Sequence, residues 1–420
     1  MRWFTLALAL AAASASAEEY SFDLSEIAKK TFEFSGYAEA KQEALSLRPD
    51  SVLGRINFPG GREHLDRSTG TLELAAAWNL PEAVINLRTH SELVDDQTGS
   101  SQINRIQEGG VRWALNREFS LDIGKRVQRW GKGYAWNPVG FVERPKDPND
   151  PQTSREGFVM AGAEWVKSLD GPLATVSLTA LTLPTQHDWN SDFGAPGHTN
   201  PAARLYLLWY DTDIDFLWQG EGSRPARFGV DFSRNLNASL EIHGEWARIL
   251  DQPRSVADGL GNVTQSTDDA DSWLLGLRYL TEKEVTWIAE YYRNGTGYSA
   301  SQLEDFYRFA DAALTAGGAP AAKATALARS GYGRANPGRD YLYLRVSAKE
   351  PFDILYFTPA VTSIVNLGDH SYSLTPEISY TGITNLELRG RLVYTHGGRY
   401  TDFGEKPNRR RAEIYARWFF

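Results

Sequence analysis

The chain has 420 residues and a formal net charge of −9, and it contains no Cys. The acidic balance disfavours nucleic-acid binding, although Arg409-Arg410-Arg411 forms a short basic run. The absence of Cys leaves no site to attach the haem of an electron conduit. No stretch beyond the N-terminal region has about 18 uninterrupted apolar residues, so the sequence offers no transmembrane helix. A transmembrane helix therefore does not account for the 13 Trp, 19 Tyr and 19 Phe.

The N-terminus has the pattern of a secretory signal peptide. Arg2 precedes the apolar run 4–13, and Ala15-Ser16-Ala17 places small residues before the acidic pair Glu18-Glu19. We expect residues 1–17 to be removed after Ala17 and residues 18–30 to form a periplasmic N-terminal segment.

From about Thr31 onward, segments of about ten residues alternate apolar and polar side chains. Even positions are apolar in 71–78, which ends at Trp78, and odd positions are apolar in 119–124. The same alternation recurs in 228–233, 240–246 and 386–392. Strands of a transmembrane β-barrel have this pattern because one face meets lipid, and Trp and Tyr near segment ends are typical of its aromatic girdles. A soluble β-sandwich is the alternative.

The connections between these segments come in two kinds. Short, turn-rich connections such as Asn116-Arg117 and Thr281-Glu282-Lys283 fit periplasmic hairpins. Longer stretches fit extracellular loops: 44–68, 129–155, 184–200, 251–270 and 295–338. Counting hairpins predicts an all-β fold, a transmembrane antiparallel β-barrel of about 18 strands over residues 31–420, with both termini periplasmic.

The faces opposite the apolar positions carry charges, which we assign to the barrel interior. A Lys or Arg on the lipid face near the midplane costs about 2 to 4 kcal/mol, so charges belong inside. The alternative for each of them is that Arg and carboxylate pairs only brace a wide barrel. The residues predicted to line the pore are Arg88, Arg112, Asp122, Arg126, Arg204, Arg227, Asp231, Glu241, Arg278, Arg345, Arg389 and Arg391.

An 18-stranded barrel leaves an aqueous path unless loops fill it, so a loop must set the bore. The segment from Lys125 to Arg155 is the candidate, because prolines and glycines shape it without helix or strand. Its basic side chains alternate with aromatic rings, a chemistry that binds polyols, carboxylates or sugars. An ordinary extracellular loop is the alternative. The predicted constriction residues are Arg129, Trp130, Lys132, Tyr134, Trp136 and Arg144.

The longest connection, about Gly295 to Gly338, contains a helix signal. Residues 301–304 read as a capping box, and apolar residues then recur at helical spacing from Leu303 to Leu314. We expect this helix to form a lid at the barrel mouth, and 321–329 to add a second helical turn or two.

Enzyme signatures are weak. Glu241, His243 and Glu245 share one strand face, where they suit a metal or acid/base chemistry, although a lining His between carboxylates is the commoner case. The sequence has no G-x-S-x-G, no H-E-x-x-H, no phosphate-binding glycine loop and no calcium-loop spacing. We therefore predict no catalytic residues, no metal and no cofactor, and keep an outer-membrane hydrolase of lipid or polysaccharide and a closed structural barrel as alternatives.

The last segment, 412–420, resembles the C-terminal signal strand of bacterial outer-membrane proteins, because Ile414, Ala416 and Trp418 precede the terminal Phe420 at every second position. Together with the signal peptide and strand count, the chain resembles large outer-membrane channels such as alginate-export-type and substrate-specific porins. The R-W-G-K-G-Y-A-W-N-P core within Gly124–Gly157 is similar to a G-x-Q…W-G-x-G…N-P pattern of proteobacterial barrel proteins. The resemblance implies a Gram-negative outer-membrane channel for a polar or anionic solute, including a carbohydrate or acidic polysaccharide. Its partners would be outer-membrane lipid, lipopolysaccharide and, through Phe420, the barrel-assembly machinery.

Overall fold

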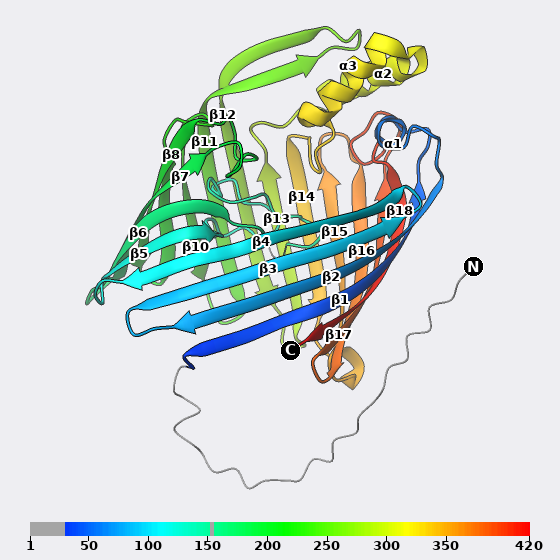
Figure 1. The fold of residues 1–420 in the computed structure, drawn as a ribbon. Helices are drawn as coiled ribbons and strands as arrows, with labels where there is room; N and C mark the ends of the chain where they lie inside the picture. Colours follow the sequence, from blue (N-terminus) through cyan, green and yellow to red (C-terminus); the bar gives the residue numbers. More distant parts are fainter. Residues whose placement is uncertain (1–29, 152–154) are drawn as a thin grey trace.

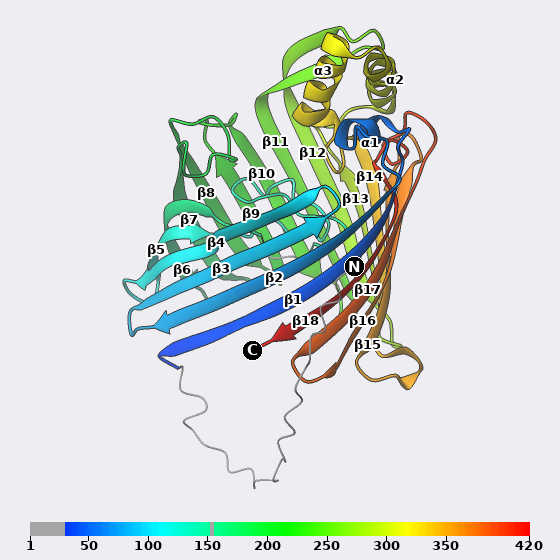
Figure 2. The same cartoon turned by 45° about the vertical axis from the view of Figure 1, so that its right-hand side comes forward.

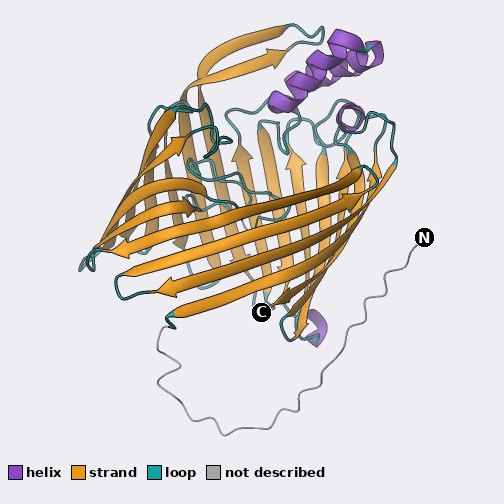
Figure 3. Cartoon of the chain, in the orientation of Figure 1, coloured by secondary structure: helices purple, strands orange, loops and turns teal. Residues whose placement is uncertain are grey.

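The computed structural model, which describes residues 30–151 and 155–420, is a closed barrel of 18 antiparallel strands (Figures 1 and 3). The predicted signal peptide and nearly all of the predicted 18–30 segment lie outside the described residues. Consecutive strands pair with each other, and β18 closes the ring on β1, where Gly36 and Phe420 exchange two backbone hydrogen bonds of 3.0 Å. The strands are β1 Phe32–Leu47, β2 His64–Asn79, β3 Ala83–Asp96, β4 Gly99–Ala114, β5 Phe119–Arg126, β6 Phe158–Ser168, β7 Leu173–Thr185, β8 His198–Trp209, β9 Thr212–Gln219, β10 Arg227–Asn235, β11 Leu240–Ala257, β12 Val263–Leu280, β13 Val285–Arg293, β14 Asp340–Ala348, β15 Phe357–Asn366, β16 Tyr372–Ile383, β17 Leu386–His396 and β18 Asn408–Phe419.

The period-two pattern of the sequence becomes an inside-out distribution of polarity. On β18 the side chain of Ile414 is 72% exposed, whereas its neighbours Glu413 and Tyr415 are each 5% exposed. Successive strand residues point to opposite faces, so the apolar residue faces outward and the charged one inward. A soluble sandwich would bury the apolar face instead, so this distribution confirms the membrane barrel. The sheet topology confirms the predicted count of 18 strands.

The start of β1, the end of β18 and the short turns lie at one end of the barrel, and the longer loops lie at the other (Figure 1). The prediction of a loop over 251–270 is wrong, because β11 and β12 stay paired as far as Ala257 and Val263. Pairing with β10 ends at Ile249 of β11, and pairing with β13 ends at Trp273 of β12. The outer part of β11 and β12 is therefore a two-stranded ribbon that rises from the barrel. Its Val256, Ala257 and Val263 pack on the helices described next, and this burial stabilises strands where the sequence suggested a loop.

A helical cap lies beyond the loop end of the barrel (Figures 1 and 2). It consists of α1 Val52–Asn57, α2 Ala300–Ala316, α3 Gly318–Leu327 and one turn of π-helix, η2 Ala328–Tyr332, while a 3₁₀ turn, η3 Pro351–Asp353, lies between β14 and β15. The capping box uses Ser299 and Gln302 rather than the predicted Ser301 and Glu304, because the helix begins two residues earlier. No helix in the described part of the chain is long and apolar enough to cross a membrane.

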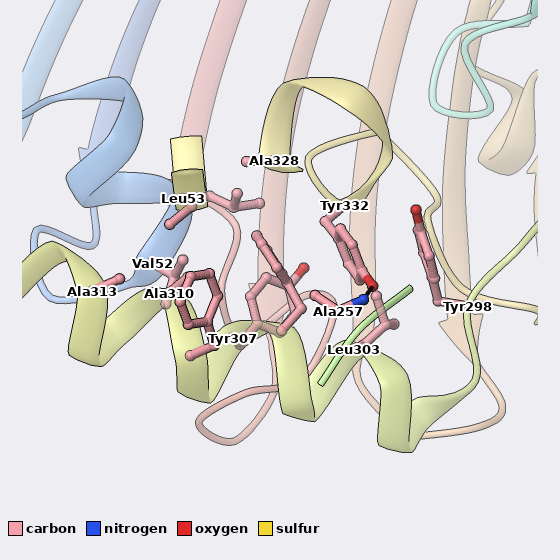
Figure 4. Close-up of a cluster of buried hydrophobic side chains, with 13 residues drawn as sticks. Val52, Leu53, Ala257, Tyr298, Leu303, Tyr307, Ala310, Ala313, Ala328 and Tyr332 are labelled. Carbon is pink, nitrogen blue, oxygen red and sulfur yellow. Dashed lines mark hydrogen bonds between the residues drawn. The ribbon is translucent and has the colours of Figure 1, made fainter. Parts of the chain in front are cut away.

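The cap has its own apolar core, which joins segments far apart in the sequence (Figure 4). The rings of Tyr332 and Phe306 stack at 4.0 Å, and Tyr332 also stacks on Tyr298 at 3.9 Å. The backbone N–H of Ala257 on the ribbon donates a hydrogen bond to the Tyr332 hydroxyl at 2.9 Å. Asp311 pairs with Arg55 of α1 at 2.7 Å. The cap, including α1, is therefore a packed unit that is fixed to the β11–β12 ribbon.

Candidate functional site: the lumenal loop and the cavity beside it

The connection between β5 and β6 folds into the barrel (Figures 2 and 3). We call residues 127–151 and 155–157 the lumenal loop. Its Trp130, Val139, Phe141 and Val142 are each no more than 2% exposed. They pack against inward side chains of the wall and its connections: Phe158, Met160, Leu181, Leu183, Phe193, Ala202, Leu217 and Ala247. This apolar cluster fills the side of the lumen bounded by β6 to β11.

Two buried carboxylates of the wall hold the loop by its backbone. Glu245 on β11 accepts hydrogen bonds from the backbone N–H of Lys132 at 2.7 Å, of Gly133 at 2.6 Å and of Val139 at 3.2 Å. Glu290 on β13 accepts from the N–H groups of Tyr134 and Ala135, the latter at 2.8 Å. Hydrogen bonds to an ionised carboxylate are stronger than those between neutral groups. Two wall side chains thus accept hydrogen bonds from five backbone N–H groups of the loop.

The close approach of the loop to Glu245 requires glycine at two positions. Gly131 has φ +93°, in the left-handed region, and a Cβ there would lie 2.8 Å from Glu245 Oε1. A Cβ on Gly133 would lie 2.2 Å from the carbonyl oxygen of Trp136. These contacts give the W-G-K-G core of the sequence a structural reason: the backbone must reach a buried carboxylate.

Side chains complete the attachment. Lys132 pairs with Asp215 at 3.0 Å and approaches Asp231 at 4.0 Å. Trp136 stacks on Tyr292 with ring centroids 5.0 Å apart. The Tyr134 hydroxyl donates to Glu241 at 2.8 Å, and this carboxylate together with burial raises the pKa of Tyr134 to about 12.

The far part of the loop reaches the opposite wall. Asp150 accepts a hydrogen bond from Arg391 on β17 at 3.2 Å. Within the loop, Glu143 pairs with Arg155 at 2.9 Å, and burial raises the pKa of Glu143. Burial also lowers the pKa of Lys146, which donates to the carbonyl of Gly133. The loop therefore spans the lumen from β11 and β13 to β17.

A cavity of about 990 Å³ remains between the loop and the wall. Its charged lining is unequal, with nine basic side chains and four carboxylates. The basic residues are Arg88, Arg129, Lys132, Lys146, Arg155, Arg278, Arg345, Arg389 and Arg391, and the acidic ones are Glu108, Asp150, Glu377 and Glu387. An excess of one sign in a low-dielectric enclosure attracts ions of the other sign.

A second cavity, of about 600 Å³, continues the first toward the turn end of the barrel. Both are lined by Asp150, Glu387 and Arg389, and the second extends to Asn385 and Phe419, close to the C-terminus. The two cavities thus lie in sequence beside the lumenal loop.

The structure places all twelve predicted pore residues on the inward face of their strands, but only some beside the large cavity. Arg88, Arg278, Arg345, Arg389 and Arg391 line it. The other seven belong to contacts within the wall or with the loop: Arg112 and Arg126 pair with Asp122, Arg204 pairs with Asp215, Arg227 lies over the Phe141 ring, Asp231 lies beside Lys132, and Glu241 accepts from Tyr134.

The predicted constriction residues divide in the same way. Arg129, Lys132 and Tyr134 line the cavity. Trp130 and Trp136 are only 1% and 8% exposed, so the expectation that their rings face a solute is wrong; both rings anchor the loop. Arg144 is bound to Asp192 at 2.8 Å and lies 4.2 Å over the Phe158 ring, which fixes the loop near β6.

The structure also gives no open site to the Glu241, His243 and Glu245 set. His243 is 1% exposed and contacts Glu290 at 2.9 Å, while Glu245 is occupied by the loop backbone. Among the described residues, no group of three or more His, Cys, Asp or Glu side chains has the arrangement of a metal site.

Sequence reasoning missed the anchoring roles of Glu245 and Glu290 and the cavity positions of Lys146, Asp150 and Arg155. The strand pattern placed the two glutamates inside but gave no sign that a loop backbone would bind them. The three loop residues stand in the charged, proline-rich stretch 143–155, which was the available signal.

Comparison with solved structures finds the same barrel fold. OccK5 (OpdH) of Pseudomonas aeruginosa aligns with a TM-score of 0.52 and 10% identity over 92% of this chain and 98% of its own. OccAB3 of Acinetobacter baumannii gives 0.52 and 11% over 93% and 99%, and OccK11 (OpdR) of P. aeruginosa gives 0.51 and 11% over 92% and 95%. The chain shares their fold. Neither protein-family models nor curated proteins match its sequence.

Proposed function

We propose that the chain is a channel of the Gram-negative outer membrane that passes a small polar or anionic solute. The observation that carries this proposal is the cavity left open beside the lumenal loop, with its excess of basic side chains. The outward apolar face of the strands supports a membrane location.

The direction of the charge imbalance supports anions over cations. Asp231, Glu245 and Glu290 are each no more than 3% exposed and contact the loop, so much of the wall's negative charge faces the loop rather than the cavity. Arg345 and Arg389, by contrast, line the cavity directly. Arginine binds carboxylate and phosphate groups through paired donors, which suits an anionic solute.

The test is conductance in planar bilayers across a KCl gradient. We expect discrete open steps and a reversal potential whose sign shows that chloride permeates more readily than potassium. Arg129→Glu reverses a charge at an exposed position of the cavity lining and should reduce the chloride preference. Arg248→Ala is the control, because Arg248 lies on β11 at the base of the β11–β12 ribbon, away from the cavity, and pairs with Asp269 at 2.8 Å.

Two results would contradict the proposal. A folded barrel that gives no conductance steps would favour a closed structural barrel. An open but cation-selective barrel would remove the assignment of an anionic solute while leaving the channel in place.

A further inference from the structure

The outer wall of the barrel carries an apolar groove across the seam where β18 meets β1. It consists of two cavities, of about 720 and 680 Å³. They follow one another along β1 and β18, the first at Ala40 and Ile414–Ala416, the second at Ala44 and Ala412. Small residues form its floor and larger apolar residues its sides, so the surface is hollowed where it faces hydrocarbon. We call this the seam groove.

The loop-side end of the seam groove has polar and aromatic side chains. The Arg410 guanidinium lies 5.9 Å from the centre of the Tyr394 ring, and the Tyr394 hydroxyl is 3.4 Å from His396 Nδ1. Tyr372 contacts the same His396 ring at 5.1 Å. Aromatic side chains with a polar tip gather at the level of lipid headgroups. The groove therefore runs from the hydrocarbon region to the headgroup region.

Arg410 differs from comparable arginines in having no carboxylate partner among the described residues. Its neighbour Arg411 points inward and pairs with Glu413 at 2.5 Å. Two other arginines near the loop end are also paired, Arg248 with Asp269 at 2.8 Å and Arg293 with Asp340 at 3.8 Å. The carboxylate of Asp66, which lines the same end of the groove, accepts a hydrogen bond from the Gln97 amide at 3.4 Å.

At the headgroup level a cation on the outer wall of a barrel costs little, and an anionic lipid headgroup attracts it. We propose that the seam groove binds the acyl chains of lipopolysaccharide, the acidic lipid of the outer leaflet, and that Arg410 donates hydrogen bonds to a phosphate of its lipid A. The Tyr394 hydroxyl is placed to donate to the same headgroup. This inference requires insertion of the barrel in a membrane but not conduction through it, so it stands apart from the proposed channel.

The experiment measures lipid retention by the full barrel. The protein is purified, freed of lipid in detergent, and titrated with lipid A, and bound lipid is counted by native mass spectrometry. Arg410→Ala removes the headgroup contact, and Ala412→Trp fills the apolar floor without removing a charge. Arg117→Ala, in the turn at the opposite end of the barrel, is the matched control.

We expect Arg410→Ala to weaken binding of the tightest lipid about fivefold, the usual contribution of one basic residue at a membrane surface. Ala412→Trp should weaken it as well, and Arg117→Ala should leave it unchanged. Equal retention by all four proteins would overturn the proposal. A mass corresponding to two chains that excludes lipid would overturn it too, because a second copy would then occupy the groove.

Discussion

Replacing Glu245 with Ala should release the lumenal loop from the wall. The substitution leaves three buried N–H groups, those of Lys132, Gly133 and Val139, without their acceptor. Each buried, unpaired donor costs about 1 to 3 kcal/mol. Water in the lumen can reach part of this site, so the lower end applies, roughly 3 kcal/mol in total, which shifts the docking equilibrium by a factor of about 150.

Single-channel recording in planar bilayers measures the result. A loop that leaves the wall part of the time should give larger and noisier conductance steps, and limited proteolysis should cut the loop faster. The conductance noise and cleavage rate of Glu245→Gln should lie between those of the wild type and Glu245→Ala. Oε1 accepts two of the three hydrogen bonds, and an amide keeps that oxygen. Glu164→Ala is the control, because it removes an inward carboxylate that accepts a hydrogen bond from Ser177, away from the loop. If Glu245→Ala matches the wild type in step size, noise and cleavage rate, the backbone contacts do not hold the loop.

Three further results are expected. Gly133→Ala should loosen the loop in the same assays, since its Cβ would lie 2.2 Å from the Trp136 carbonyl. Burial holds the pKa of Lys146 below its usual 10.5, so raising the pH from about 7 to 10 should remove its charge before that of exposed lysines and reduce the chloride preference in reversal-potential measurements; Lys146→Arg should lack this change. Phe306→Ala should cost the cap about 3 to 5 kcal/mol and make α2 protease-sensitive, while the heat-dependent gel mobility of the barrel stays the same.

The barrel follows from the sequence because its governing signal is local and repeated. Alternation such as that around Ile414 requires only that one face meet hydrocarbon, and every strand repeats the requirement. The β11–β12 ribbon was missed because its outer part carries no such requirement. Its strands persist through contact with the cap, as in the hydrogen bond from the Ala257 N–H to the Tyr332 hydroxyl, and that contact joins segments 75 residues apart.

The candidate site was less predictable because it depends on where one loop settles. The sequence correctly indicated inward charges, but the apolar contacts of Trp130 and Phe141 decide which wall the loop covers. Trp130 suited a sugar-binding surface as well as a core position. The choice between them is made by side chains such as Leu183 and Leu217, which come from distant strands.

Arginines and carboxylates share the inward faces of the strands, which suggests a lumen of mixed charge, yet the loop binds some of the carboxylates. Donors of the loop backbone select the carboxylates Glu245 and Glu290, because a bent, glycine-containing backbone presents N–H groups in clusters that only an acceptor can satisfy. Arg345 and Arg389, which only donate, cannot bind these N–H groups, and both line the cavity. An infolded loop anchored through its amides therefore leaves the cavity positive even when the wall as a whole is balanced, and charge counts over the strands underestimate that effect.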